Sequence, residues 1–314
     1  MSDDRRRQAA LATAWERFPA VAERVGRVYG LRVPRHLGVF WAFWRSADDA
    51  ERAALDALGL SLIGVTDYFG DRGPRLVGRD GLDERLHGRF RQDPAEFVTV
   101  LAGHSDGLHY GLWYDDPAEL PSFVVHNHAR DSAETWSDGR PTLLAELRDL
   151  VHRASLDYGA DSEDAPLVRP LLAALDWFAP AERDALQADG APRRASALRS
   201  FSAVSVFPAL PPDSGDPLLA ESAARLKGFQ TGAPEAAEWI ARAERELASG
   251  APALALAVGS ELHWLDHDAY RAESRALLTA AYRSLGRDAH ADLIDLHSAH
   301  RDLRSVDVLV LPAP

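Results

Sequence analysis

The sequence contains no cysteine, and this absence excludes several kinds of site at once. Disulfide bridges, thiol nucleophiles and cysteine-ligated zinc are impossible anywhere in its 314 residues. Long apolar runs are missing as well, since none approaches the roughly 20 residues of a membrane-spanning helix. The first residues, MSDDRRRQAALATAWERF, lack the apolar segment of a secretory signal peptide. We therefore predict a cytoplasmic protein that does not enter a membrane.

Basic residues are in deficit, because 35 lysines and arginines stand against 48 aspartates and glutamates, for a formal charge of −13. A general nucleic-acid binder needs a basic surface that neutralises phosphates, so this composition argues against that function. The apolar fraction of 46% and the charged fraction of 26% are typical of a folded globular protein. The length allows one large domain or two ordinary ones.

The sequence also has no glycine loop of the phosphate-binding type. It does contain the pentapeptide GHSDG (103–107), which fits the G-x-S-x-G pattern of hydrolases. That motif requires a helix directly after the serine. Here residues 108–114, LHYGLWY, are aromatic and roughly alternating, which indicates a strand. We predict that Ser105 lies in a β-hairpin connection and is not a nucleophile.

One histidine pair has the spacing of metal ligands. On a helix, His263 and His267 would share a face, as two zinc ligands do. Spacing fixes no third ligand, and Trp264 occupies the position where a metalloprotease has glutamate. A metal site and a polar helix end are both compatible with the pair, and the helix end is favoured. We predict no metal and no cofactor.

Hydrophobic periodicity predicts an α+β fold that begins with a sheet-bearing part. Strands are expected over 61–65, 96–102, 108–114 and 122–126, and the short connections between the last three imply an antiparallel sheet. Helices that end at Tyr29, begin at Pro34 and cover about 141–155 are expected to flank it, and 72–85 reads as an irregular loop. The aromatic side chains expected in its core are Phe40, Trp41, Trp44, Phe97, Tyr110 and Trp113.

The second part is predicted to be mainly helical. Its predicted helices cover 171–186, 221–228, 234–248, 253–266, 269–285 and 288–300, and further strands are expected at 201–207 and 306–311. The acidic stretch 157–164 is the expected boundary. We accordingly divide the chain into an N-terminal α+β lobe with an antiparallel sheet, 1–158, and a mainly helical C-terminal lobe, 159–314.

Several segments resemble one protein family, in that family's order and at similar separations. The matching text is YGLRVPRHLGVFWAFW (29–44), LGLSLIGVTDYF (58–69), LHGRFRQDPAEFVTVLAG (86–103) and LHYGLWYDDPAELPSFV (108–124), with fainter matches at 255–264 and 277–297. These segments are similar to those of the histone PARylation factor family and its bacterial relatives. The resemblance covers most of the chain from about residue 25. It implies an accessory factor whose partner is a poly(ADP-ribose) polymerase-like ADP-ribosyltransferase.

The resemblance also implies a catalytic contribution. Members of this family lend the polymerase a glutamate that deprotonates a substrate serine, so that modification moves from acidic residues to serine. That glutamate belongs to an acidic pair shortly before the segment matching ALAVGSELHW, where this chain has Ala248 and Ser249. The nearest acids are Glu246, which we take as the first candidate, and Glu244, the second.

A non-catalytic alternative stays open at this point. The opening Y-G-L-x-V-P, followed by an aromatic helix, is also similar to interaction modules of the Smi1/Knr4-like immunity type, over a much shorter span. In either case the chain at most completes a partner's active site. The sequence leaves its oligomeric state open.

Overall fold

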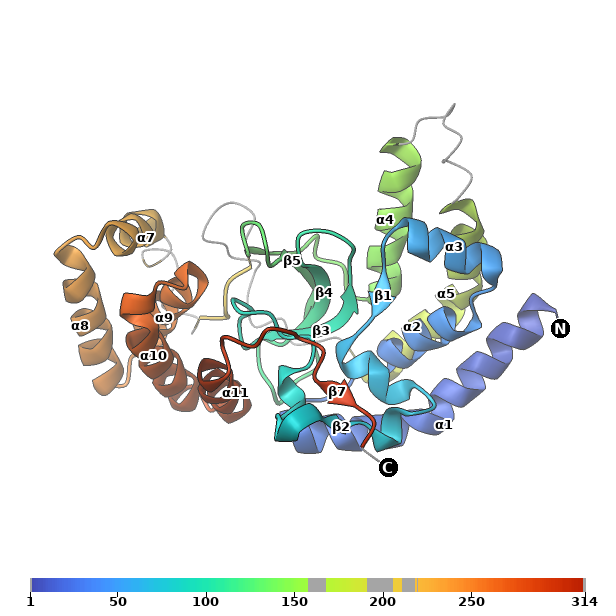
Figure 1. Cartoon of the computed structure of the whole chain (residues 1–314), viewed down its shortest axis with the longest axis horizontal. Coiled ribbons are helices and arrows are strands. Elements are labelled where there is room, and N and C mark those ends of the chain that lie inside the picture. The colour runs from blue at the N-terminus through green and yellow to red at the C-terminus, as the bar shows by residue number, and fades with distance from the viewer. Residues whose placement is uncertain (1, 158–167, 191–205, 211–217, 219, 313–314) are drawn as a thin grey trace.

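A computed structural model describes residues 2–157, 168–190, 206–210, 218 and 220–312. In it, an antiparallel sheet lies between two groups of helices, which come from the N-terminal and C-terminal parts of the chain (Figure 1). The fold is therefore α+β, with an N-terminal sheet flanked by helices and a mainly helical C-terminal region, as predicted.

The sheet has five strands in the order β1-β3-β4-β5-β6, and every neighbouring pair is antiparallel. Because side chains alternate between the faces of a strand, β4 directs Leu112 to one face and Trp113 to the other. The strands are β1 (Ser61–Leu62), β3 (Phe97–Ala102), β4 (Leu108–Trp113), β5 (Phe123–His128) and β6 (Thr135–Trp136).

The Leu112 face of the sheet belongs to the larger core, which the N-terminal helices share. Phe40, Trp41 and Tyr110 lie in this core and Phe97 and Trp113 on the opposite face, all buried as predicted. Trp44 is only partly buried and packs against the same core. The helices of this group are α1 (Asp3–Tyr29), α2 (Arg35–Ser46), α3 (Asp49–Ala57), α4 (Leu143–Asp157) and α5 (Arg169–Asp189).

The strand predicted over 61–65 is wrong in its second half, where the chain forms a 3₁₀ helix, Gly64–Phe69. Gly64 has a left-handed φ of 78°, and a Cβ atom at this position would lie 2.1 Å from the Thr99 carbonyl oxygen. The Thr66 hydroxyl then donates to the Val100 carbonyl oxygen at 3.0 Å. A close approach that only glycine permits therefore ends the strand early.

Two short elements of the N-terminal lobe, helix α3 and strand β2 (Val77–Gly78), were not predicted from the sequence. Helix α3 begins at a capping box, in which Asp48 and Glu51 bond each other's backbone amides. Residues 72–85, expected as a loop, contain β2 (Val77–Gly78), which pairs with the C-terminal strand β7 (Leu309–Val310). Further 3₁₀ turns are Gly73–Arg75, Arg79–Gly81 and Glu84–Leu86.

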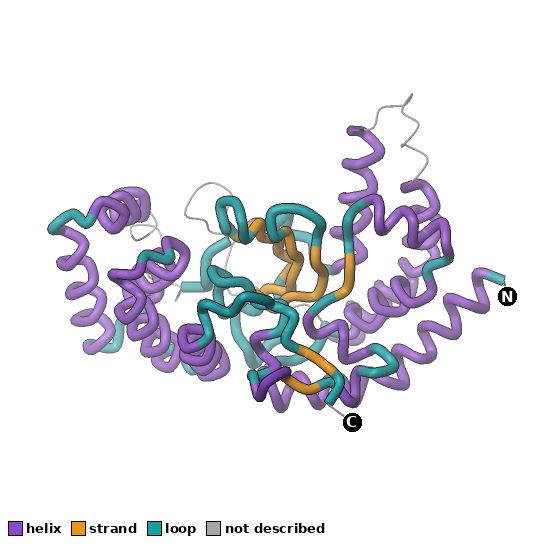
Figure 2. The backbone as a smooth tube through the Cα atoms, viewed as in Figure 1, coloured by secondary structure: helices purple, strands orange, loops and turns teal. Residues whose placement is uncertain are grey.

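The C-terminal helices, purple in Figure 2, follow the prediction to within a few residues. Their buried apolar side chains belong to a second core. Small residues allow close packing in this core, since a Cβ atom at Gly259 would lie 2.8 Å from Leu278 Cγ. The helices are α7 (Ser222–Thr231), α8 (Glu235–Ala248), α9 (Ala253–Leu265), α10 (Arg271–Ser284) and α11 (Asp288–Ala299), with a 3₁₀ turn at Asp268–Tyr270.

The C-terminal tail crosses from the helical lobe back to the N-terminal lobe (Figure 1). The His87 ring Nδ1 accepts the amides of Val308 and Leu309 at 3.1 and 3.3 Å, and the Gly88 amide donates to the Val306 carbonyl at 2.8 Å. The tail therefore ties the two lobes together. Of the strand predicted at 306–311, only Leu309–Val310 is present, as β7.

The boundary region is only partly described. The acidic stretch 157–164 lies outside the described residues except for Asp157, and so do residues 201–205 of the strand predicted over 201–207. Val206 and Phe207 are described and are not in a strand. Helix α5 packs against α2, and its apolar residues join the larger core. The division at 158/159 stays a prediction.

Candidate functional site

The two predicted carboxylates lie near the end of α8, at the outer edge of the helical lobe (Figure 1). Helix α8 ends at Ala248, as predicted, and Gly250 then adopts a left-handed φ of 87° that turns the chain into α9. Glu246 therefore lies in the last turn. Its backbone carbonyl accepts the Ser249 hydroxyl at 2.7 Å and the Ala251 amide at 2.9 Å.

Glu246 and Glu244 point to different sides of the helix, because residues two apart are about 200° apart around its axis. Glu246 Oε1 accepts Arg242 Nε at 2.7 Å and is half-buried, whereas Glu244 is exposed. The interaction with Glu246 raises the pKa of Arg242. The helix thus separates the two candidates, and only Glu246 has an ion pair among the described residues.

The positions expected for the family's acidic pair lie one turn further along. Glu246 shares a helix face with Ser249 at i,i+3, and Glu244 shares one with Ala248 at i,i+4. Each glutamate therefore projects from the side of the helix on which one of those two residues lies. Each glutamate lies about one helical turn before the position that the family's acidic pair would occupy.

A buried ion pair supports the helices behind α8. The Arg225 guanidinium of α7 donates to both Glu261 oxygens of α9, at 2.8 Å from Nε and 2.5 Å from Nη2. Both side chains are fully buried, and the same Arg225 Nη2 also donates to the Leu218 carbonyl at 2.7 Å. The relative positions of α7 and α9 thus depend on a bidentate charge pair.

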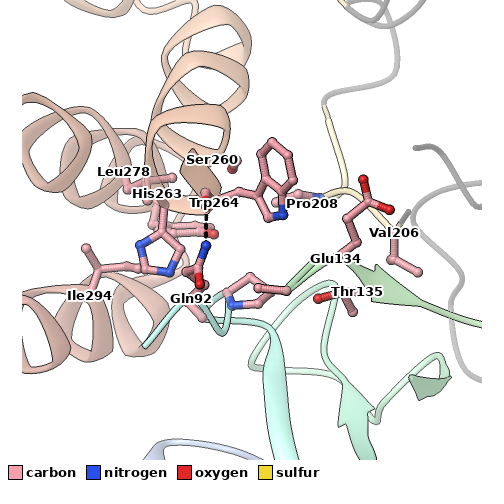
Figure 3. Close-up of a pocket in the computed structure, with 14 residues that line it drawn as sticks. Gln92, Glu134, Thr135, Val206, Pro208, Ser260, His263, Trp264, Leu278 and Ile294 are labelled. Atoms are coloured by element: carbon pink, nitrogen blue, oxygen red, sulfur yellow. Dashed lines mark hydrogen bonds between the residues drawn. The ribbon is translucent and has the colours of Figure 1, made fainter. Parts of the chain in front are cut away.

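Between the two lobes lies a small notch, shown in Figure 3. The Gln92 side chain donates to the Trp264 carbonyl oxygen at 2.6 Å, and apolar side chains such as Pro208 and Leu278 form the walls. Its cavity of about 30 Å³ holds roughly one water molecule. The notch is therefore too small for a nucleotide or a sugar, and it is part of the junction between the lobes.

Two polar contacts across this junction are fully buried. The Tyr282 hydroxyl of α10 lies 2.8 and 3.0 Å from the two Glu96 carboxylate oxygens, next to β3. Burial raises the pKa of Glu96 to about 7. His263 Nε2 donates to the Asp93 carbonyl oxygen at 3.0 Å, and burial lowers the pKa of His263 to about 3. His263 is therefore a neutral hydrogen-bond donor that joins α9 to the sheet lobe.

The structure gives no support to the hydrolase and metal interpretations. Ser105 lies in the hairpin connection between β3 and β4, as predicted, and is exposed. His267 lies beyond the end of α9, where its Nδ1 accepts the Ala269 amide, so it does not share a helix face with His263. Within the described ranges, no group of three or more possible ligands could hold a metal ion.

None of the described helices combines the length and the apolar character of a membrane-spanning segment.

Sequence reasoning missed the Arg225–Glu261 pair and the junction residues Gln92, Glu96 and Tyr282. Each contact joins residues that are 36 to 186 positions apart, so no local spacing in the sequence predicts it. The one available signal was a charged residue, Glu261, inside the strongly apolar run of α9.

The chain is similar to proteins of one family. The family profile described as Histone PARylation factor 1 matches residues 20–157. Histone PARylation factor 1 of Mus musculus is 25% identical over 316 aligned residues, which cover 91% of this chain and 88% of the mouse protein. The Bos taurus protein of that name is 27% identical over 305 residues, covering 90% and 87%. The Danio rerio protein is 34% identical over 111 residues, covering 34% and 31%.

Proposed function

We propose that the chain, which is similar to histone PARylation factor 1 proteins over about nine-tenths of its length, docks on an ADP-ribosyltransferase and directs transfer to serine. The coarser role, that of a histone PARylation accessory factor, follows from the relatives. The similarity to the mouse and cattle proteins covers about nine-tenths of the chain and so includes the helical lobe. That coverage is the observation that carries the proposal.

The proposed docking surface is the exposed end of α8. This end lies away from the sheet, at the outer edge of the helical lobe (Figure 1), and no described segment covers Glu244, Ala248 or Ser249. A transferase that packs against this edge would bring its bound substrate close to the last turn of the helix.

The proposed chemistry is general base catalysis by Glu246. Exclusion of water favours the neutral form of a carboxyl group and so makes its carboxylate a stronger base. A stronger base accepts the proton of a serine hydroxyl more readily. Arg242 must first release Glu246, and Glu221 offers it a second carboxylate, 3.9 Å from Arg242 Nη1. Glu244 has no ion pair to break within the described part of the chain, which keeps it as the second candidate.

The test is a transfer assay with the host's ADP-ribosyltransferase, labelled NAD and a serine-containing acceptor, with the chain and its variants added. Glu246→Gln is expected to reduce the hydroxylamine-resistant, serine-linked product by about tenfold or more, since one general base contributes about 10²–10⁴ in rate. Glu238→Gln is the matched control, because Glu238 is exposed on the first turn of the same helix and loses the same charge.

Two outcomes decide between the candidates and the alternative. Loss of serine linkage in Glu244→Gln but not in Glu246→Gln would transfer the role to Glu244. If both variants match the wild type, and the product stays hydroxylamine-labile, the chain lends no base and is a binding module. Ser249→Glu, added to the inactive variant, is expected to restore serine linkage if the acid is needed at the family's position.

A further inference from the structure

A basic pocket lies where the C-terminal tail passes the sheet lobe. Its cavity of about 470 Å³ is within the range of small-molecule sites. Five arginines and one aspartate line it, although the whole chain carries a formal charge of −13. We call it the basic pocket and define it by Arg89, Arg91, Arg130, Arg301, Arg304 and Asp302.

Arg89 is a buried charge in this pocket without a bonded carboxylate. It is 7% exposed, and its two terminal nitrogens donate to the backbone carbonyls of Asp93, Pro94 and Phe97. Its Nε is buried and has no hydrogen-bond partner among the described residues. The Asp93 carboxylate is close by but is bonded to His109 and to the Phe90 amide. A buried charge of this kind favours a nearby anion.

The other four arginines are only partly neutralised. Arg91 and Arg301 share one carboxylate, that of Asp266, and Arg91 also lies 3.5 Å from Asp302. Arg130 and Arg304 are exposed, and neither has an ion pair in the described ranges. Even with Asp266 counted, five guanidinium groups therefore face two carboxylates. The pocket carries a local positive charge that draws anions.

The pocket is not lined by charge alone. Leu86, Phe90 and Leu303 contribute apolar surface beside the arginines, which a bare inorganic anion would not use. Guanidinium groups bind phosphate oxygens through paired N–H donors. We propose that the basic pocket binds a diphosphate-bearing organic anion of nucleotide size, with its phosphates on the arginines and its organic part on the apolar wall.

The proposal is independent of the transferase, since binding can be measured with the full chain alone. Isothermal titration with adenosine diphosphate and with inorganic pyrophosphate is expected to give one site, with the nucleotide bound more tightly. Arg130→Gln and Arg304→Gln are each expected to weaken binding of adenosine diphosphate about tenfold, as loss of a charge-assisted hydrogen bond does. Arg52→Gln is the matched control, because Arg52 is exposed on α3 and lies outside the pocket.

Several outcomes would overturn the proposal. They are no binding of adenosine diphosphate at millimolar concentration, equal affinity in wild type, Arg130→Gln and Arg304→Gln, and equal affinity for pyrophosphate and nucleotide. A single-stranded oligonucleotide that binds much more tightly than adenosine diphosphate would identify a nucleic-acid site instead. Neither arginine has a described side-chain hydrogen bond, so both variants are expected to keep the wild-type thermal midpoint.

Discussion

The two lobes of this chain hold their shape in different ways. The N-terminal lobe has a large aromatic core, in which strands and helices distant in sequence meet, and the family profile falls mostly within it. The helical lobe has a smaller core of alanine and leucine side chains, with one fully buried ion pair between α7 and α9. Both lobes also pair charges below the surface: Arg7 with Glu51 at 2.6 Å in the first lobe, and Arg225 with Glu261 in the second, where both side chains are 0% exposed.

The two lobes also differ in their proposed roles: the helical lobe carries the candidate catalytic residues, and the sheet lobe supports it. The carboxylates proposed to act lie on the helical lobe, outside the residues that the profile matches. The sheet lobe instead fixes the helical lobe in place, through Glu96, Gln92 and the C-terminal tail. Destabilising substitutions are therefore expected to act through lost aromatic packing in the sheet lobe and through an unpaired buried charge in the helical lobe.

The largest effect is expected in the helical lobe, from Glu261→Gln. This change leaves the fully buried Arg225 charge without a counter-charge, which typically costs about 3–5 kcal/mol in the free energy of unfolding. Denaturant titration measures it. The double variant Arg225→Met/Glu261→Leu removes both charges and is expected to be much closer to the wild type. A double variant as unstable as the single one would show that the pair's charge does not matter.

An effect of similar size is expected in the sheet lobe from Trp41→Ala. Trp41 is 3% exposed and its ring stacks on Phe69 at 5.7 Å, so truncation leaves a cavity that costs about 3–5 kcal/mol. Trp41→Phe keeps part of the ring and should lose less. Equal unfolding midpoints for the alanine variant and the wild type would mean that this side chain is free for a partner and is not core.

The junction between the lobes is expected to respond to pH through Glu96. Its folded pKa of about 7 lies above the ordinary value of 4.5, so its contribution is full below pH 4.5 and is lost as pH rises through 7. Glu96→Gln mimics the protonated form. Its stability relative to the wild type should rise by about 3 kcal/mol between pH 4.5 and 8.

Comparison with the wild type at each pH removes the contribution of the buried histidines, which titrate in both proteins. Burial lowers the pKa of His36 and His126 to about 4, so they destabilise the folded protein below pH 6.5 in the wild type and the variant alike. A stability difference that is constant from pH 5 to 8 would contradict the assignment for Glu96.

The smallest effect on stability is expected at the proposed site itself. Glu246→Gln removes a partly exposed i,i+4 ion pair with Arg242, which contributes at most about 0.5 kcal/mol. Thermal unfolding should therefore place this variant within about a degree or two of the wild type. A large loss of stability would mean that any loss of transfer activity reflects misfolding.

Much of this arrangement could be predicted from local sequence patterns. The aromatic alternation of LHYGLWY identified the β3–β4 hairpin, and helical periodicity with a Ser-Gly stop placed the end of α8. The first half of the predicted strand 61–65 is present, but Gly64 turns the chain out of the sheet. The capping signal at Asp48 and Glu51 was present and was overlooked.

The remaining features depend on contacts that no local pattern encodes. Strands β2 and β7 have two residues each and lie more than 200 positions apart. The arginines of the basic pocket come from segments around Arg89, Arg130 and Arg301, so the pocket arises only when the tail returns to the sheet lobe. Sequence alone gave the two candidate glutamates, and the structure adds which helix face each occupies.

The central claim is that this chain changes where its partner transferase attaches ADP-ribose. The most direct measurement is the fraction of label that resists hydroxylamine when the transferase acts with the chain, without it, and with the Glu244→Gln/Glu246→Gln double variant. We predict that the resistant, serine-linked fraction rises with the wild-type chain and stays at the level without it when the double variant is added. A resistant fraction that is the same in all three reactions would contradict the claim.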